Sequence, residues 1–307
     1  MGSIRWGLCC QFLDAPIRFR AATATYVLRL PPRERWEYLR EIAQDNAESL
    51  TRAIAQCHAL GIGAFRITSQ ILPLATHPKA GYTLPTLDPT GTIRKAFRAA
   101  GKHAKAAGIR LSFHPDQFVV VNSERPSVVD GSLQELEFQA EVAALVGADV
   151  IVIHGGGKAG GMEASLTRLE AGLRRLSRRA RGRLALENDD RSFTPSDLLP
   201  LCNRLQIPLV YDVHHHRCLP DGLSVAEATR RALATWGSRE PHFHLSSPRS
   251  GWNRGDPRPH AEYLDPRDVP REWRSLALTV DVEAKAKERA VVAIARHTDS
   301  RPRKSRS

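Results

Sequence analysis

Short apolar runs alternate with longer amphipathic segments along this 307-residue chain, and this alternation limits its possible folds more than any other feature. Short runs rich in β-branched residues predict strands, and apolar residues at three- and four-residue steps predict helices. A chain in which the two alternate typically builds a parallel sheet from strand–helix units. Eight strands are predicted, over 4–10, 64–68, 109–114, 149–154, 183–187, 208–212, 242–246 and 276–283.

Helical patterns occupy the segments between these strands. The clearest covers 34–60, where Trp36, Leu39 and Ala43 begin an apolar stripe. Gly61 is expected to end this helix. Further helices are predicted over 92–107, 132–146, 163–180, 196–205, 224–236 and 284–296. Eight strands each followed by a helix predict an α/β fold, a single TIM-type (β/α)8 barrel. A doubly wound open sheet is the alternative, because one sequence does not reveal strand order.

The predicted barrel forms one domain over 1–296, and we expect the short basic tail at 297–307 to be disordered. Three connections, 11–33, 69–91 and 247–275, are much longer than the usual length of about 4–6 residues. They follow predicted strands one, two and seven. We therefore expect long loops on the C-terminal face, where such barrels build their active sites.

The charge of the chain favours a polyanionic partner such as nucleic acid. Lysine and arginine total 45 against 33 acidic residues, a formal charge of +12. The five cysteines are scattered in no zinc-finger or redox spacing, which suits reduced thiols inside a cell. No apolar run approaches the roughly 20 residues of a membrane span. We expect a soluble, cytoplasmic monomer without membrane association, near the nucleoid in a prokaryote.

Metal-ligand residue types end six consecutive predicted strands. The stretch PLVYDVHHHRC, 208–218, begins as a buried strand and ends in an acid and three histidines. The carboxyl ends of parallel barrel strands meet at one rim, so side chains distant in sequence converge there. The candidate ligands are His114, His154, Glu187, Asp212, His215, His244 and Glu283, with His260 from the loop after strand seven as an eighth.

Taken singly, these residues have simpler explanations. A strand-end histidine is more often a helix cap or a core group, and Glu187 could pair with an arginine. Separate explanations would each have to place a metal-ligand residue type at the end of six consecutive strands. A shared metal site explains this pattern better. Imidazole and carboxylate ligands together suit zinc, manganese or iron. Because eight candidates exceed what one ion needs, we predict two or three divalent ions, bridged by Glu187 or Asp212, as in clusters that hydrolyse phosphoesters.

The glycine-rich stretch HGGGKAGG, 154–161, contains the dinucleotide-binding pattern G-x-G-x-x-G. It comes late, after three strand–helix units, and His154 already occupies a predicted ligand position, so we expect no nucleotide cofactor. The glycines would instead let DNA or a bound phosphate approach the backbone near Lys158. The stretch is also similar to an esterase oxyanion loop, but the chain has no G-x-S-x-G elbow.

Four motifs, FHPDQFVVVNS, LENDDRSFTPSDLL, YDVHHHRC and VEAKAKE, together resemble the ultraviolet damage endonuclease family, and the resemblance runs from about Ile4 to Arg289. It implies a barrel related to endonuclease IV, with a manganese or zinc cluster that nicks DNA immediately 5′ of a lesion. It implies the same eight ligands, with catalytic roles for Glu187, Asp212, His244 and Glu283. It also places a lesion-probing pair at Gln117 and Phe118, which would wedge into the damaged duplex.

Several positions depart from the family pattern. The family has glycine and tyrosine in place of Asp116 and Phe118, a lysine in place of His242, and a histidine near Gln70. Near the first strand, Leu8 and the Cys9-Cys10-Gln11 run replace a tyrosine and a more polar loop. The predicted ligands are kept and the lesion-facing residues differ. The resemblance therefore implies nuclease chemistry more strongly than specificity for ultraviolet photoproducts.

The leading interpretation is a metal-dependent DNA repair endonuclease that acts on damaged double-stranded DNA. A sugar isomerase or epimerase is the alternative from another class, because such enzymes use rim carboxylates and one or two divalent ions in the same barrel. Five candidate histidines and the basic charge count against it. A third hypothesis is a DNA-binding protein that has kept the fold and lost the activity.

Overall fold

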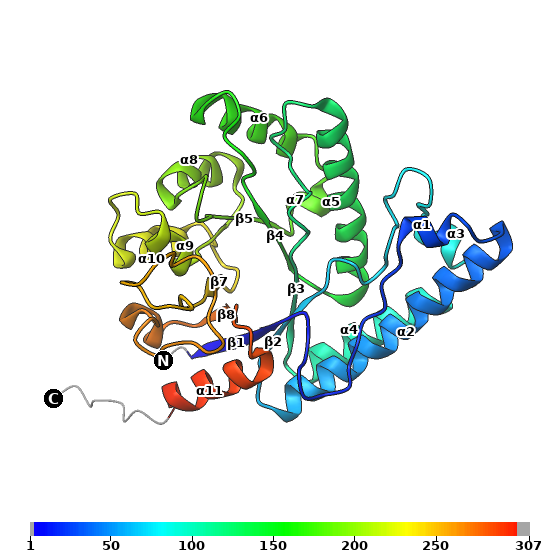
Figure 1. The fold of residues 1–307 in the computed structure, drawn as a ribbon, viewed down its shortest axis with the longest axis horizontal. Coiled ribbons are helices and arrows are strands. Elements are labelled where there is room, and N and C mark those ends of the chain that lie inside the picture. The colour runs from blue at the N-terminus through cyan, green and yellow to red at the C-terminus, as the bar shows by residue number, and fades with distance from the viewer. Residues whose placement is uncertain (1–2, 300–307) are drawn as a thin grey trace.

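The computed structural model describes residues 3–299, which fold into a parallel β-barrel surrounded by helices (Figure 1). The strands are β1 (Ile4–Cys9), β2 (Ala64–Ile67), β3 (Arg110–Phe113), β4 (Val150–His154), β5 (Leu184–Glu187), β6 (Leu209–Val210), β7 (His242–Leu245) and β8 (Leu278–Val282). They are hydrogen-bonded in the order β6-β5-β4-β3-β2-β1-β8-β7. Every pair is parallel, so the predicted TIM-type barrel is confirmed.

The barrel closes between β6 and β7 through an isolated β-bridge rather than a ladder. β6 is only two residues long and makes no ladder with β7. Instead, Asp212 and His244 form an isolated parallel bridge, in which the His244 N–H donates to the Tyr211 carbonyl at 3.1 Å. Two of the predicted ligands therefore lie where the barrel is joined.

Eleven α-helices and one 3₁₀ helix lie within the described residues. The α-helices are α1 (Ala24–Val27), α2 (Pro32–Ala59), α3 (Leu84–Leu87), α4 (Thr92–Ala106), α5 (Pro126–Val146), α6 (Met162–Arg174), α7 (Arg178–Arg181), α8 (Pro195–Leu205), α9 (Val213–Cys218), α10 (Val225–Ala234) and α11 (Lys287–Asp299), and the 3₁₀ helix is η1 (Arg271–Ser275). Each of the three segments predicted to be long loops contains one short helix, α1, α3 or η1.

Local signals explain where several helices begin and end. α8 starts with a capping box, in which Thr194 and Asp197 hydrogen-bond each other's backbone N–H groups, and Pro195 occupies the first helical position. α5 ends at Gly147, whose φ of 74° favours glycine. α11 extends to Asp299, three residues into the predicted tail, because its helical pattern continues past the expected end. The rest of that tail, 300–307, lies outside the described residues.

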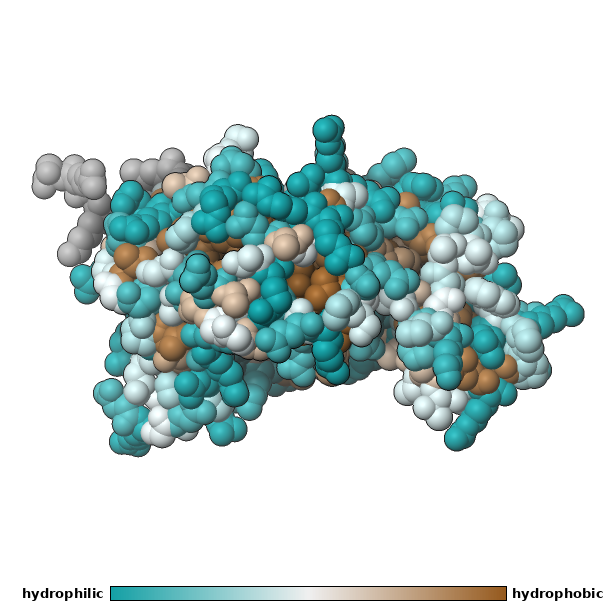
Figure 2. Space-filling model, turned by 90° about the horizontal axis from the view of Figure 1, so that it is seen from above, coloured by the Kyte–Doolittle hydropathy of each residue, from teal (hydrophilic) through white to brown (hydrophobic). Residues whose placement is uncertain are grey.

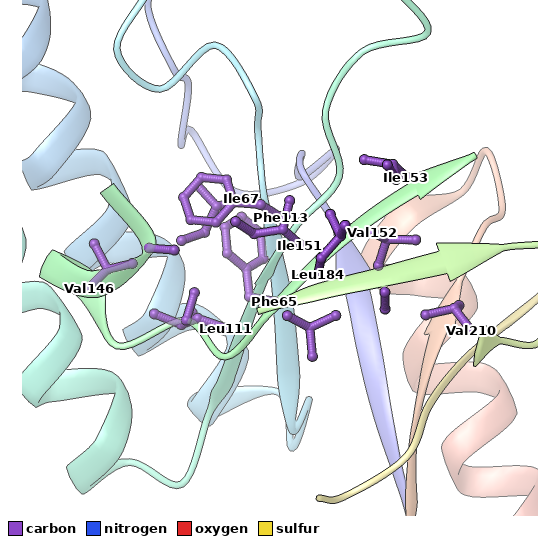
Figure 3. Packing of buried hydrophobic residues seen from close by; sticks show 14 of the residues in the cluster. Phe65, Ile67, Leu111, Phe113, Val146, Ile151, Val152, Ile153, Leu184 and Val210 are labelled. Carbon is purple, nitrogen blue, oxygen red and sulfur yellow. The ribbon is translucent and has the colours of Figure 1, made fainter. Parts of the chain in front are cut away.

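The main core lies between the strands and the helices, and side chains alternate along each strand between this core and the barrel interior. Figure 3 shows Phe65 and Ile67 of β2 and Leu111 and Phe113 of β3 gathered on the helix side of the strands. The residues between them, such as Arg66, point to the other side of the strand. The polar residues of the strands are thereby collected inside the barrel.

The face of the molecule in Figure 2 is mostly hydrophilic, and hydrophobic atoms show only in small separate areas. Among the described helices, none has both the length and the apolar character needed to cross a membrane.

Candidate metal centre

Strand alternation and parallel register bring the predicted ligands together at one end of the barrel interior. His154 is paired with Glu187 across β4 and β5, and His244 with Asp281 across β7 and β8. His114 directly follows β3 and Glu283 directly follows β8. Side chains from several different strands therefore face a common space, although up to 169 positions separate them in the chain.

Glu187 lies at the middle of this group, surrounded by four imidazoles. His114 Nε2 is 2.9 Å from Oε2, and His244 Nδ1 is 3.0 Å from Oε1. His215 Nδ1 lies 3.4 Å from Oε1, and His154 Nε2 lies 3.8 Å from Oε2. The Glu187 side chain is only 1 % exposed, so both of its oxygens are directed at imidazole nitrogens rather than at bulk water.

Asp212 and His215 reach the site from a helix rather than from a strand end. The three consecutive histidines were expected to end a strand, but β6 stops at Val210, and Asp212 is the N-cap of α9. Its Oδ1 accepts the backbone N–H of His215 at 2.8 Å, the usual bond of an aspartate N-cap. The resulting helical turn directs only His215 at Glu187, while His214 and His216 face other partners.

Glu283 and His260 form the other side of the site. His260 belongs to the loop after β7, where it pairs with Pro248 in an antiparallel bridge. Its Nδ1 lies 3.7 Å from Glu283 Oε2, and Glu283 Oε1 lies 3.7 Å from His244 Nδ1. All eight predicted ligands are thus in one connected group, and we refer to them together as the Glu187 cluster.

Opposite charges in this cluster shift the pKa values of its members. Burial alone would raise the pKa of Glu187, but the imidazoles of His244 and His154 and the hydrogen bond from His114 hold it well below its usual range. Burial would lower the pKa of His215, but Asp212 and Glu187 raise it well above the ordinary histidine value. The Glu187 carboxylate therefore stays ionised and available as a ligand.

The arrangement fits divalent ions on two observations. Two buried atoms of cluster residues, His154 Nδ1 and Asp212 Oδ2, have no hydrogen-bond partner among the described residues. In addition, His114 Nδ1 lies 3.1 Å from the Pro115 carbonyl oxygen. A bound ion would replace the proton that Nε2 shares with Glu187, and a proton on Nδ1 would then hold the ring in the orientation usual for metal-binding histidines.

The predicted DNA-contacting residues lie outside the Glu187 cluster. Gln117 and Phe118 are exposed in the loop after β3, and the Phe118 side chain is 77 % exposed. Lys158 is exposed in the glycine-rich loop after β4. The glycine at 156 has its own structural reason, since a Cβ atom there would lie 2.1 Å from Asn122 Oδ1 at a φ of 84°.

Three contacts near the cluster were not predicted. Arg66 of β2 lies 2.6 Å from Glu283 Oε1, and Asp281 of β8 lies 3.1 Å from His242. Asn188 holds the backbone of Asp212 by accepting its N–H at 3.0 Å and donating to its carbonyl at 2.9 Å. The sequence does contain a signal for the contacts of Arg66 and Asp281. Each is a charged residue inside an otherwise apolar strand run, AFRIT or LALTVDVE.

A family model described as UV-endonuclease UvdE matches residues 4–302 of this chain. The chain belongs to the UV-endonuclease UvdE family. A UV DNA damage endonuclease of Deinococcus radiodurans is 33 % identical over 301 residues, which cover 94 % of this chain and 93 % of the relative. One from Bacillus cereus (strain Q1) is 30 % identical over 251 residues, covering 80 % and 77 %. The resemblance predicted from the four motifs is confirmed.

Solved structures agree with this membership of the UvdE family. SacUVDE superimposes with a TM-score of 0.86 at 27 % identity, over 96 % of this chain and 98 % of that protein. Endonuclease IV from Thermus thermophilus has a TM-score of 0.61 at 19 % identity, over 96 % and 98 %. A D-psicose 3-epimerase has a TM-score of 0.54 at 14 % identity, over 82 % and 91 %. The last two identities are low and show a shared fold alone.

Proposed function

We propose that this protein is a metal-dependent DNA repair endonuclease, which cuts the phosphodiester backbone on the 5′ side of a damaged site in duplex DNA. The observation that carries the proposal is the surrounding of the buried Glu187 carboxylate by four imidazoles. Membership of the UvdE family and the names of the curated relatives support the same activity. The five histidines of the cluster are more than a sugar isomerase needs, which argues against that alternative.

Two or three divalent ions, manganese or zinc, would be held by the eight residues of the Glu187 cluster. Glu187 is placed to bridge ions, because its two oxygens face different histidine pairs. Asp212 offers Oδ2, which has no hydrogen-bond partner among residues 3–299. His154 and His260 are the most exposed ligands, at 35 % and 28 % of their side chains, so they lie on the side that DNA would approach. Bound divalent ions activate water and neutralise charge on a phosphodiester.

The chain's own residues would fix the scissile phosphate and its surroundings. Glu187, Asp212, His244 and Glu283 would keep the ions in place, because each is at least largely buried and contacts neighbouring residues of the cluster. Phe118, with Gln117 beside it, would wedge between bases next to the lesion, since its ring is free on the surface. Lys158 would contact a phosphate from the glycine-rich loop. Damage lowers the free energy needed to unstack the bases, so a damaged duplex would be bound in preference to an intact one.

A nicking assay tests the proposal. Irradiated and undamaged labelled duplexes are incubated with the full chain and Mn²⁺, and the products are separated by length. We expect cleavage 5′ of the damaged site on the irradiated duplex, and loss of cleavage after chelation with EDTA. Glu187→Gln keeps the size of the side chain and removes its charge, so activity should fall at least about 1000-fold.

Glu34→Gln is the matched control, because it makes the same chemical change at an exposed position in the first turn of α2. Its activity should equal that of the wild type. Equal cleavage by wild type and Glu187→Gln, or cleavage unaffected by EDTA, would exclude the proposed mechanism. Turnover of a ketose without DNA cleavage would support the isomerase instead.

A further inference from the structure

A second group of metal-ligating side chains lies one layer below the Glu187 cluster, inside the barrel. It consists of His242 and His244 of β7 and Asp281 of β8, and all three are fully buried. One ligand atom of each lies within 4.8 Å of the others. His244 joins the two layers, because its Nδ1 is 3.0 Å from Glu187 and its Nε2 is 3.8 Å from Asp281.

The polar atoms of this lower group contact one another only at ion-pair distances and have no hydrogen bonds among the described residues. Within residues 3–299, no hydrogen-bond partner exists for His242 Nδ1 and Nε2, His244 Nε2, or Asp281 Oδ1 and Oδ2. Leaving a buried polar atom without a hydrogen bond destabilises a protein, and a charged one does so more strongly. Native proteins tolerate few such atoms, and an ion is one of the usual reasons for a group of them. Five buried atoms without a hydrogen bond, on three neighbouring residues, fit a bound cation.

Distances within the group favour a cation over direct hydrogen bonds. His242 Nε2 is 3.1 Å from Asp281 Oδ2, an ion-pair distance, but the contact does not have the geometry of a hydrogen bond. His244 Nε2 lies 3.8 Å from the same oxygen. Ligand atoms on a tetrahedral zinc ion, with bonds of about 2.0–2.1 Å, are roughly 3.3 Å apart. The two observed distances lie on either side of this value.

The local charge also favours a cation. Arg66 Nε is 3.6 Å from Asp281 Oδ2, but Arg66 Nη2 is closer, at 2.6 Å, to Glu283 Oε1. The Arg66 guanidinium is therefore shared by the carboxylates of Asp281 and Glu283. These three side chains, counted by themselves, carry a net negative charge. Gly7 on β1 leaves room for the Asp281 side chain, because a Cβ atom at position 7 would lie 2.2 Å from Asp281 Oδ1.

We propose that His242, His244 and Asp281 bind one further divalent ion of the Zn²⁺ type, distinct from the ions of the Glu187 cluster. Two imidazoles and one carboxylate form a common zinc-binding set. The inference rests in part on the proposed function, since His244 belongs to both sites. When both sites are filled, His244 bridges them as an imidazolate, and its N–H proton passes to solvent.

Burial predicts how this ion behaves. Its three ligands have no exposed surface, so the ion is enclosed as the barrel forms and leaves slowly. The Glu187 cluster is more accessible, because the side chains of His154 and His260 are 35 % and 28 % exposed. A chelator should therefore strip the two sites at different rates.

Anomalous X-ray diffraction at the zinc edge, from crystals of the full chain grown with ZnCl₂, locates the ions directly. We expect a peak about 2.0–2.2 Å from a ring nitrogen of His242 and from an Asp281 oxygen. Peaks only in the Glu187 cluster would overturn this inference and leave the proposed function intact. A peak only at the lower site would keep the inference and count against the proposed function. The absence of both peaks would overturn the two together.

Zinc content, measured by mass spectrometry after dialysis of folded protein against EDTA, gives an independent test. About one zinc per chain should remain in the wild type and be lost when EDTA is present during unfolding. Asp281→Asn and His242→Gln should retain none. Ser165→Ala, a buried polar position on α6 outside the barrel interior, is the control and should retain one. Equal retention by wild type and both site variants, or none in the wild type, would overturn the inference. Where a variant fails to fold, the wild-type diffraction decides.

Discussion

Arg66 and Glu283 form an ion pair inside the barrel, with Arg66 Nη2 2.6 Å from Glu283 Oε1. Their side chains are 8 % and 17 % exposed, so water screens the pair little. Burial alone would raise the pKa of Glu283, but Arg66 and then His244 lower it. Arg66 provides the counter charge of Glu283 in this structure, and since Glu283 is also a proposed metal ligand, we expect Arg66 to compete with a bound ion.

The first prediction concerns removal of this counter charge. Arg66→Met should lower the free energy of unfolding of ion-free protein by about 3–5 kcal/mol, because it leaves a buried carboxylate without its partner. Saturating Mn²⁺ should restore part of the loss, since the metal replaces the arginine. Urea denaturation with and without Mn²⁺ measures both quantities. Arg33→Met, which breaks an exposed pair with Glu37, should have little effect. An equal loss for Arg66→Met in both conditions would contradict the competition.

The second prediction concerns the pH dependence of metal binding. Burial alone would lower the pKa values of His215 and His244. Asp212 and Glu187 instead raise the pKa of His215 above the ordinary histidine value, and Glu187 raises that of His244. Both rings thus carry a proton at pH values where a free histidine has lost it, and metal must displace that proton. Affinity for Mn²⁺ should therefore increase from about pH 6 to about pH 8. Calorimetric titration in buffers of different ionisation enthalpy should show proton release on binding, and pH-independent affinity would contradict it.

The strand ends were predictable because two general rules place them. Side chains alternate along a strand, and parallel strands present their carboxyl ends at one rim, so the positions of His114, His154 and Glu187 follow from their own short segments. Neither rule fixes the conformation of the residues just beyond a short strand. Asp212 is the N-cap of a helix, although an aspartate after an apolar strand run also suits a strand end. The local sequence alone therefore does not distinguish the two.

The lower site was harder to predict, because it depends on register between strands. His242 and Asp281 come together only when β7 pairs with β8 and the barrel also places Gly7 beside them. Register is set by the packing of the whole barrel, which a single sequence does not reveal. The competing role of Arg66 depends in the same way on contacts among β1, β2 and β8.

The third prediction concerns acid stability. Burial alone would raise the pKa of Asp221, but the N–H groups of Ser196 and Leu223 and the His216 ring lower it to about 2. A depressed folded pKa stabilises the protein above the unfolded value of about 3.9, and this contribution disappears as the pH falls through about 2. The size is about 2 kcal/mol. Asp221→Asn should flatten the stability curve between about pH 4 and about pH 2 by this amount. Asp130→Asn, at an exposed pair, should not, and an unchanged curve for Asp221→Asn would contradict the assignment.

The fourth prediction concerns Phe118, whose side chain is 77 % exposed in the loop after β3. If its ring stacks against bases beside a lesion, Phe118→Ala loses roughly 1–3 kcal/mol, which weakens binding of irradiated duplex by about 5- to 150-fold. Fluorescence anisotropy measures this with Glu187→Gln as the background, so that the duplex stays intact.

Three comparisons separate stacking at Phe118 from a general loss of binding. Phe118→Tyr should keep the affinity of the parent, because a tyrosine ring stacks equally well. Undamaged duplex should bind Phe118→Ala nearly as well as it binds the parent, because phosphate contacts supply most of that affinity. Thermal stability should stay unchanged, since the side chain packs against little of the protein. Equal affinity of Phe118→Ala and its parent for irradiated duplex would assign lesion recognition to other residues and remove Phe118 from the site.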